Sequence, residues 1–342
     1  MPITFANLPN KMSSAIDVLL TGQGSDAWVI RAQQLHEKYQ SSDRKNPKGY
    51  IHDMDDVLGY LGLRVPATFA QLYSSLLQVQ EMMPSWQPKQ ILDLGCGPGT
   101  GAWAARSVWD SVERAVCLDE NRSFLQVGSA LSRQTDFALD CTWIQKDIRF
   151  GLDEDIEPAD LVIIGNVLNE LHPEMREKVL GKAFNCTKGL LVIVESGTPK
   201  GSLIVQECAR KLQQAGVLVA PYVNNSLVID ESFWLHFSQR FIRPDFQRRV
   251  RQRMRGESEM ASDWEDAKFS LSVVSKIPAE IQPWGRCVGH VQQHNGYVSL
   301  PVLTAEKIEH LTVLKRTKEK YNYAKNVKWG ELIMDRYAIM GV

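Results

Sequence analysis

The fold is decided by the stretch Ile91-Leu92-Asp93-Leu94-Gly95-Cys96-Gly97-Pro98-Gly99-Thr100-Gly101. A short apolar run ends at Asp93, and glycines then occupy every second position up to Gly101. Glycine is favoured where the backbone adopts positive φ or approaches a ligand closely. Residues 102–106 (Ala-Trp-Ala-Ala-Arg) then predict the start of a helix. A strand, a glycine loop and a helix N-terminus together form an arrangement that binds nucleotide-like ligands.

Two ligand classes fit this loop. Residues 97–102 match the GxGxxA pattern of dinucleotide sites. Asp93, two residues before the first glycine, is the form seen in S-adenosylmethionine (SAM) methyltransferases, and Pro98 inside the pattern also favours SAM. We therefore expect SAM, with its amino-acid part over Gly95, Cys96 and Gly97 and with Gly99 completing the loop.

The bulk composition is that of an ordinary globular protein. The chain has 342 residues, of which 44% are hydrophobic and 23% charged, and it carries a formal net charge of −1. Any nucleic-acid binding must therefore depend on local patches. Six cysteines without CxxC spacing predict neither a disulfide framework nor a metal site.

The sequence shows no recognisable targeting or membrane-spanning segment. Residues 1–14 have the pattern of neither a signal peptide nor a transit peptide. No apolar run approaches the ~18 residues of a membrane span. We therefore expect a cytoplasmic protein without a membrane partner.

Apolar periodicity divides the chain into three parts. Residues 1–85 predict helices, one of which starts at Pro66, and residues 41–50 predict a polar loop. Residues 86–220 alternate short apolar strands with helices, which predicts a doubly wound, Rossmann-like α/β domain of the SAM-dependent methyltransferase type. Residues 221–342 predict a smaller, basic and partly β-rich module.

The expected elements can be placed approximately. The strands of the α/β domain are expected at 91–92, 115–119, 141–144, 159–164 and 189–195. Its helices include 121–132, 174–186 and 202–215. The β-like runs of the C-terminal module are 271–274, 296–300 and 311–314.

Polar residues follow the strands of the predicted sheet, at the edge where ligands gather. Asp119 is expected to accept hydrogen bonds from both ribose hydroxyls, and the neighbouring Glu120 is the other candidate for this role. If Asp119 does not bind a ligand, it is explained as a residue of a surface turn. Asp147 is expected to meet the adenine amino group and Ile148 the ring, although a helix N-cap explains Asp147 nearly as well. Asn166 ends the fourth strand and is the further candidate.

No catalytic residue can be named from the sequence. The segment after the fourth strand is not the Asn/Asp-Pro-Pro-Tyr/Phe run of amino-group methyltransferases. No cysteine falls at this edge, which disfavours a thiolate nucleophile acting on cytosine C5. If methyl transfer occurs, we expect the rate enhancement to come from the proximity and alignment of a nucleophile with the SAM methyl group.

A run of arginines marks the start of the third part. Residues 239–255 contain seven arginines and one acid, Asp245. Arginine binds phosphate through its planar donor fork, so the run predicts an RNA-binding face. Its expected members are Arg240, Arg248, Arg249, Arg251 and Arg255. A solvated amphipathic helix is the structural alternative, and we expect no DNA partner.

Taken together, several motifs resemble the small-ribosomal-subunit methyltransferase-like family of bacteria and mitochondria. They are Tyr60 with residues 64–68 (RVPAT), the glycine loop to Trp103, residues 168–171 (LNEL), 194–201 (VESGTPKG), 234–240 (WLHFSQR), 265–270 (EDAKFS) and 323–330 (YAKNVKWG). The resemblance implies a SAM-binding fold whose sheet includes an antiparallel seventh strand. It also implies a role in assembly of the small subunit.

One departure from that family concerns a metal cluster. The resemblance implies four cysteines that hold an iron–sulfur cluster, and thiolates are the usual ligands of such clusters. Tyr222 and Leu235 stand where two of them are expected, and Leu303 replaces the fourth. Cys287 alone cannot substitute for them. We therefore predict no iron–sulfur cluster and expect apolar packing to close the region.

Three hypotheses follow. The first is a SAM-dependent methyltransferase-like protein that acts on or at the small ribosomal subunit and its rRNA. The second is an assembly factor that has the same fold and binds SAM but does not catalyse methyl transfer. The third is a methyltransferase for small molecules, which leaves the arginine run unexplained.

Overall fold

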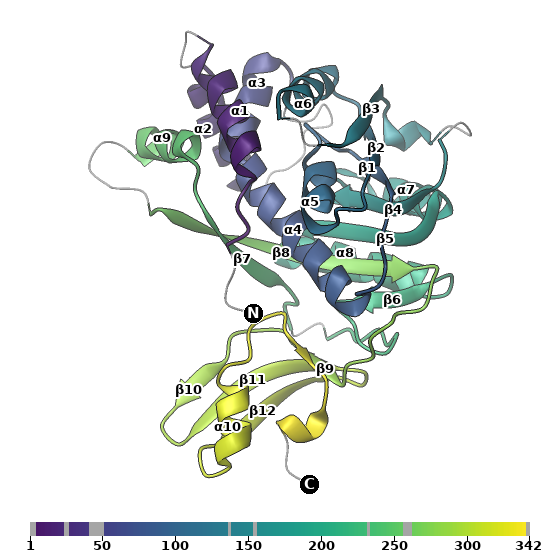
Figure 1. Ribbon diagram of the computed structural model, residues 1–342, viewed down its shortest axis with the longest axis vertical. Helices are drawn as coiled ribbons and strands as arrows, with labels where there is room; N and C mark the ends of the chain where they lie inside the picture. Colours follow the sequence, from purple (N-terminus) through teal and green to yellow (C-terminus); the bar gives the residue numbers. More distant parts are fainter. Residues whose placement is uncertain are drawn as a thin grey trace.

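The computed structural model describes residues 5–23, 27–40, 51–135, 138–152, 156–230, 233–255 and 262–339. The polar loop expected at 41–50 lies outside these residues. Within them, the strands form an eight-stranded sheet and a five-stranded sheet, and the smaller sheet lies below the larger in Figure 1. None of the described helices is both long and apolar enough to cross a membrane.

The large sheet confirms the predicted doubly wound α/β fold. Its order is β3-β2-β1-β4-β5-β8-β6, with β7 paired to β8, and the strands from β1 to β5 run parallel. The order reverses between β1 and β4, so their carboxyl ends border the crevice where ligands bind in such sheets. The strands are β1 (Gln90–Leu94), β2 (Arg114–Asp119), β3 (Asp140–Gln145), β4 (Ala159–Gly165), β5 (Thr187–Ser196), β6 (Val217–Ala220), β7 (Phe237–Ile242) and β8 (Trp264–Ser275).

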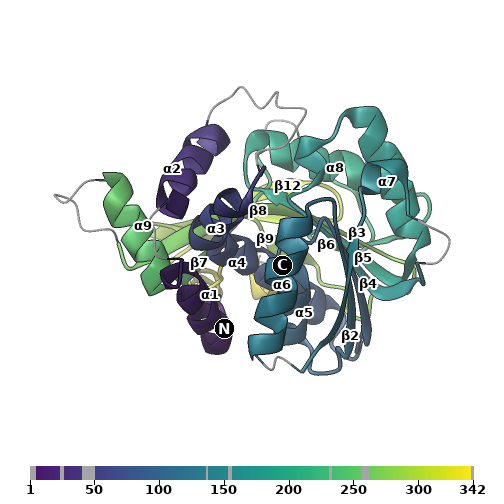
Figure 2. The same ribbon diagram turned by 90° about the horizontal axis from the view of Figure 1, so that it is seen from above.

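Helices cover both faces of this sheet, as Figure 2 shows. Accordingly, β4 and β5 are mostly apolar, and residues 190–194 of β5 are completely buried. One face is covered by α4 (Val65–Met82), α5 (Thr100–Val108) and α6 (Arg122–Thr135), and the other by α7 (Pro173–Asn185) and α8 (Pro199–Leu212). Pro66 lies in the first turn of α4, as predicted.

The N-terminal region is helical, as the periodicity indicated. Its helices are α1 (Asn10–Thr21), α2 (Ala27–Gln40) and α3 (Met54–Leu63), which precede α4. In Figure 1 they lie together with α9 (Asp245–Arg255), beside the sheet. Met12, Ile16 and Leu20 of α1 recur at helical spacing and are fully buried in the main core.

One predicted β-run occupies a different place from the one expected. Residues 271–274 belong to β8, which lies in the large sheet between β5 and β6 and is antiparallel to both. Val273, for example, pairs with Val192 of β5. Periodicity identifies a buried strand but does not say which sheet receives it. Residues 221–342 therefore supply strands to both sheets, and β8 is the antiparallel strand that the resemblance implied.

The small sheet has a core of its own, to which Val298, Leu300 and Val313 contribute. The runs 296–300 and 311–314 fall in β11 and β12, which confirms this part of the predicted module. Its elements are β9 (Gly285–Cys287), β10 (Gln292–His294), β11 (Tyr297–Thr304), β12 (Ile308–Leu314), β13 (Leu332–Ile333) and α10 (Lys318–Ala324).

A fully buried arginine joins the small sheet to the rest of the chain. Arg286 of β9 donates from Nε to the Pro221 carbonyl at 3.1 Å and from Nη1 to the Gly330 carbonyl at 2.8 Å. Burial lowers the pKa of this guanidinium to about 10, a value at which it stays charged at neutral pH. Because a buried charge is costly unless it is hydrogen-bonded, Arg286 fixes where β9 docks.

Candidate functional site

The glycine loop connects β1 to α5 with three left-handed residues. Gly95, Gly97 and Gly99 have φ of 70°, 55° and 95°, a region that L side chains rarely adopt. The amides of Gly95 and Cys96 both donate to the Leu118 carbonyl, at 2.8 and 2.9 Å. The loop is thus held against the end of β2, and glycine is needed for its backbone conformation.

Gly97 is the glycine of this loop that faces open space. A Cβ added to Gly99 meets the Trp143 ring at 2.6 Å, whereas one added to Gly97 meets no atom within 4 Å. Packing inside the protein therefore does not require the missing side chain at Gly97. A ligand that approaches the backbone closely is a physical reason for such a gap.

Asp93 lies beneath the loop and holds it from inside. Its side chain is 3% exposed and accepts a hydrogen bond from the Ala102 amide at 3.2 Å, in the first turn of α5. Burial raises the pKa of this carboxyl group to about 7, although the backbone hydrogen bonds favour its charged form. The sequence-predicted residue is therefore at the site, where it braces the start of α5.

Asp119 lies where the end of β2 meets the loop. One carboxylate oxygen accepts from the Gly97 amide and the other from the Asn121 amide, both at 2.8 Å. Burial raises the pKa of Asp119 to about 6, against the effect of these two hydrogen bonds. The structure therefore brings Asp119 and Gly97 into direct contact, as a ribose-binding acid beside a glycine loop requires.

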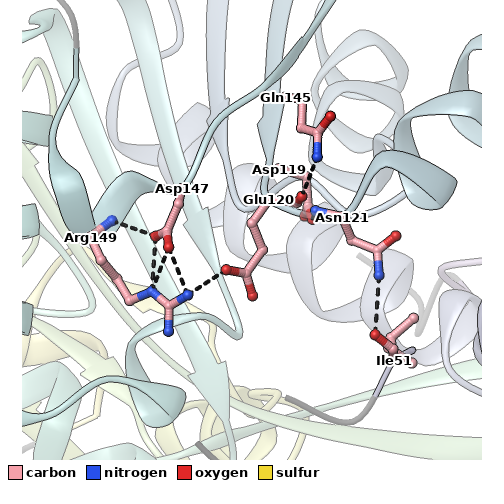
Figure 3. Close-up of polar contacts among 7 residues, drawn as sticks. All are labelled: Ile51, Asp119, Glu120, Asn121, Gln145, Asp147 and Arg149. Atoms are coloured by element: carbon pink, nitrogen blue, oxygen red, sulfur yellow. Dashed lines mark hydrogen bonds and ion pairs between the residues drawn. The ribbon is translucent and has the colours of Figure 1, made fainter. Parts of the chain in front are cut away.

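Asp147 takes the helix-capping role that was the alternative explanation in the sequence. It caps the short 3-10 helix η1 (Ile148–Phe150) by accepting from the Arg149 amide at 2.9 Å. The Arg149 side chain binds both oxygens of Asp147 and also reaches Glu120 at 2.5 Å (Figure 3). Burial raises the pKa of Asp147, but the hydrogen bonds from Arg149 outweigh it, so the pKa lies below its ordinary value.

Two other predicted residues lie close to the same edge. Ile148 is only 7% exposed and packs in the main core. Asn166 follows β4 with a φ of 60°, and its side-chain amide donates to Gln71 of α4 at 3.0 Å. Asparagine tolerates this left-handed conformation better than most residues. The Asn166 side chain is thus directed to α4.

Sequence reasoning missed a buried carboxyl group at the end of β5. Glu195 has no exposed surface, and its oxygens accept from the Asn169 backbone at 3.2 Å and from the Asn169 side chain at 2.8 Å. Burial raises the pKa of Glu195 to about 7. Asn169 and Glu195 lie in the motifs LNEL and VESGTPKG. These motifs supported the family resemblance, but they did not indicate that the two side chains are in contact. The pair positions the segment after β4.

Arg149 and Asn121 were missed as well. The Asn121 side chain caps the start of α6 at Ser123 and donates to the Ile51 carbonyl at 3.2 Å, which joins the carboxyl end of β2 to the segment before α3 (Figure 3). Arg149 lies two residues beyond Asp147 and carries no motif of its own. The contacts of Arg149 with Glu120 and of Asn121 with Ile51 join segments 29 and 70 residues apart in the sequence, so spacing alone could not reveal them.

Several arginines of the run are paired with acids, most of which lie outside residues 239–255. Arg251 binds Glu265 at 3.2 Å and Arg243 binds the same carboxylate at 3.0 Å. Arg248 pairs with Asp245 and, at 3.5 Å, with Asp263. The expected excess of positive charge over residues 239–255 is therefore reduced by neighbours in space.

Two further arginines that were predicted to contact RNA, Arg249 and Arg240, are also paired with acids. Arg249 pairs with Asp17 of α1, and Arg240 binds Asp266 with two hydrogen bonds of 2.9 and 3.0 Å. Arg255 is the last residue of α9, and its side chain lies outside what the structure describes. Arg249 thus joins α9 to α1, and Arg251 joins α9 to β8.

The region expected to lack an iron–sulfur cluster is closed by apolar packing, as predicted. Tyr222, Leu235 and Leu303 are at most 5% exposed and lie in the same core cluster. Cys287 is fully buried, and its thiol donates to the Gly289 carbonyl at 3.2 Å. All six cysteines of the chain are free. The absence of the cluster itself stays a prediction.

Comparison with curated proteins finds a mitochondrial relative. Over 197 residues the chain is 25% identical to the human ribosome assembly protein METTL17, mitochondrial, and the match covers 56% of this chain. The chain spans 42% of the length of that relative.

Comparison with solved structures finds methyltransferases at low similarity. A precorrin-6y C5,15-methyltransferase from Geobacter metallireducens matches at 14% identity and a TM-score of 0.39, covering 59% of this chain and 88% of its own. An O-methyltransferase family protein from Burkholderia thailandensis matches at 16% identity and a TM-score of 0.37, covering 60% of this chain and 67% of its own.

The comparisons correct one expectation and settle the family. The expected cytoplasmic location is contradicted, because the family model that matches and the human relative are both described as mitochondrial. That family model is the mitochondrial small ribosomal subunit protein Rsm22, and it matches residues 54–334. Because this match covers most of the chain, the chain belongs to the Rsm22 family.

Proposed function

We propose that this protein binds SAM at the carboxyl edge of β1, β2 and β4 and acts as a methyltransferase-like factor at the small ribosomal subunit. The observation that carries the proposal is the contact between Asp119 and Gly97, beside open space at the Gly97 Cα. The proposed location follows the mitochondrial description of the family.

The residues present at this edge fit SAM. Asp119 ends β2 and offers carboxylate oxygens to ribose hydroxyls, as acids at this position do in nucleotide-binding sheets. Its raised pKa of about 6 leaves it charged at neutral pH. SAM, when bound, supplies an activated methyl group on a positively charged sulfur, and an ionised carboxylate nearby favours that charge.

The adenine end of the site is more constrained. Asp147 is the proposed acceptor for the adenine amino group, but Arg149 holds both of its oxygens. The carboxylate therefore has to share its lone pairs between Arg149 and a ligand. This competition is a reason to expect moderate rather than tight SAM affinity.

Action at the small subunit is supported by family membership and by the human relative. The chain belongs to the family described as mitochondrial small ribosomal subunit Rsm22, and METTL17 is named a ribosome assembly protein. The proposed partner is the small subunit through its rRNA. Arg240 and the α9 arginines remain proposed phosphate contacts, although their ion pairs must open or be shared for this.

Catalysis and silent binding are both compatible with this site. Asp93 is buried and accepts a hydrogen bond from the Ala102 amide of α5, and Glu195 is buried and accepts from Asn169, so neither is presented as a general base. Alignment of a nucleophile with the methyl group can by itself accelerate transfer. We favour an enzyme that relies on positioning, with a catalytically silent assembly factor as the second candidate.

One experiment separates these candidates. The purified protein is incubated with SAM labelled in its methyl group together with deproteinised rRNA, immature small subunits or a pool of small metabolites. Label in RNA supports the enzyme. Binding of SAM without label in any RNA supports the silent factor, and label only in metabolites contradicts action at the small subunit.

A further inference from the structure

The strands β7 and β8 form a ribbon that extends from the large sheet toward α9 (Figure 1). Successive side chains of a strand point to opposite faces, so the ribbon has an inner and an outer set. The inner set, which includes Phe241 and Ala267, packs against Ala67 and Ala70 of α4. The outer set is solvent-facing and consists of Ser238, Arg240, Ile242, Trp264, Asp266 and Lys268.

Two exposed tryptophans mark the ends of this outer face. Trp264, at the start of β8, is 42% exposed, and Trp234, three residues before β7, is 39% exposed. Such large apolar rings are usually buried, and these two are separated by polar and charged side chains rather than joined in one apolar patch.

Each tryptophan carries a stacked or cationic neighbour. The Arg240 guanidinium lies 3.6 Å from the Trp264 ring centroid, and its bidentate contact with Asp266 fixes its plane. The His236 ring stacks on Trp234 at 3.9 Å, with an interplanar angle of 16°. The Lys268 ammonium lies 5.2 Å from the Trp234 ring. Flat, pre-oriented groups with adjacent cations are therefore present at both ends of the ribbon.

This combination favours a single-stranded nucleic acid over a protein partner. The centres of protein interfaces are depleted of charged residues, whereas Arg240, Asp266 and Lys268 occupy the centre of this face. Unpaired bases stack on aromatic side chains and on arginine planes, while nearby cations meet phosphates. Trp264 and Lys268 are four residues apart on one strand, about 13 Å, which leaves room for a short run of nucleotides.

We propose that the outer face of the β7–β8 ribbon, from Trp264 to Trp234, binds single-stranded RNA by base stacking. The inference rests on the proposed function, because rRNA is the RNA that the protein is expected to meet. It adds a site that depends on stacking and differs from the arginines of α9, which depend on charge.

The test uses the full-length protein and a fluorescent oligoribonucleotide of about 12 nucleotides, within the ~4–16 nucleotides that single-strand-binding folds cover. Trp264→Ala and Trp234→Ala are each expected to weaken binding by roughly 5- to 100-fold. The slope of affinity against salt is expected to stay nearly unchanged, since no phosphate contact is removed. Tyr337→Ala, which removes an aromatic residue that is 60% exposed elsewhere, is the matched control.

Trp264→Phe keeps a stacking ring and is expected to retain most of the affinity. If the alanine variants fold with unchanged thermal midpoints and bind as tightly as the parent, the ribbon is not the RNA site. Loss of binding only on charge reversal in α9 also overturns the ribbon but leaves the proposed function intact. Failure of the parent protein to bind RNA, with SAM binding retained in the same sample, overturns both RNA proposals and spares the cofactor site.

Discussion

Two regions of this molecule are rich in charged residues, and they differ in how these charges are paired. At the carboxyl edge of the large sheet, Asp93 and Asp119 are buried against backbone amides, and burial raises their pKa values to about 7 and 6. Around α9, the acid Glu265 meets two arginines, Arg243 and Arg251. Asp119 is held by backbone amides beside the open space at Gly97, where we propose that the ligand binds. Arginines with acidic partners indicate a structure that is already satisfied.

The largest effect is expected from Gly97→Ala. The new methyl group enters open space beside Asp119 and strains a residue whose φ is 55°, so SAM affinity is expected to fall by about 100-fold or more, roughly 3 kcal/mol. Titration calorimetry measures this loss.

The matched control for that variant is Gly296→Ala. Gly296 has a φ of 92° and also has no atom within 4 Å of an added Cβ, but it lies between β10 and β11 of the small sheet. The Gly296→Ala substitution imposes the same kind of backbone strain, but it is not in the proposed SAM site. Equal SAM affinity in the two variants would mean that Gly97 does not face the ligand.

The next effect concerns a buried acid, Glu195, at the carboxyl end of β5. Burial raises the pKa of Glu195 from 4.5 to about 7, so its folded form binds a proton more tightly than its unfolded form. The stabilising contribution is complete below about pH 4.5 and is lost as the pH rises through about 7, by on the order of 3 kcal/mol.

Glu195→Gln removes this titration. Urea unfolding of both proteins at pH 5, 6, 7 and 8 is expected to show the parent losing stability relative to the variant as the pH rises. The Asn169 contact keeps one acceptor in the variant, so it is expected to fold. Parallel stability profiles for the two proteins would show that Glu195 is not a buried acid of this kind.

A smaller effect, on the stability of the fold, is expected from substitutions of the α9 arginines. Arg251 is mostly buried against Glu265, with side-chain exposures of 12% and 21%, so Arg251→Ala is expected to destabilise the fold by about 2 kcal/mol. Arg249→Ala breaks an exposed pair with Asp17 and is expected to cost about 0.2–1 kcal/mol. Thermal or urea unfolding compares them. Equal, negligible losses would show that the arginines of α9 are free for RNA rather than structural.

The same contrast explains what the sequence could predict. The strands, their alternation with helices and the glycine loop depend on local patterns, and the structure confirms them. The position of β8 depends on the strands with which it pairs. A local apolar run such as 271–274 predicts a strand but does not indicate its partners. The two sheets therefore divide the last third of the chain in a way that periodicity missed.

The candidate site was predictable to the same degree. Gly97 and Asp119 follow from motif spacing, and the structure brings them together. The engagement of Asp147 by Arg149 and the pairing of Arg249 with Asp17 depend on side-chain directions and on distant segments. A count of arginines within a window of sequence contains no information about acids that fold against them.

The most direct measurement of the central claim is calorimetric titration of SAM into the parent protein and into Asp119→Ala. The account predicts saturable binding of one SAM per chain in the parent and none that is detectable in the variant, with both proteins folded. Unchanged affinity in the folded variant, or no binding to the parent, would contradict the assignment of SAM to the edge formed by Gly97 and Asp119.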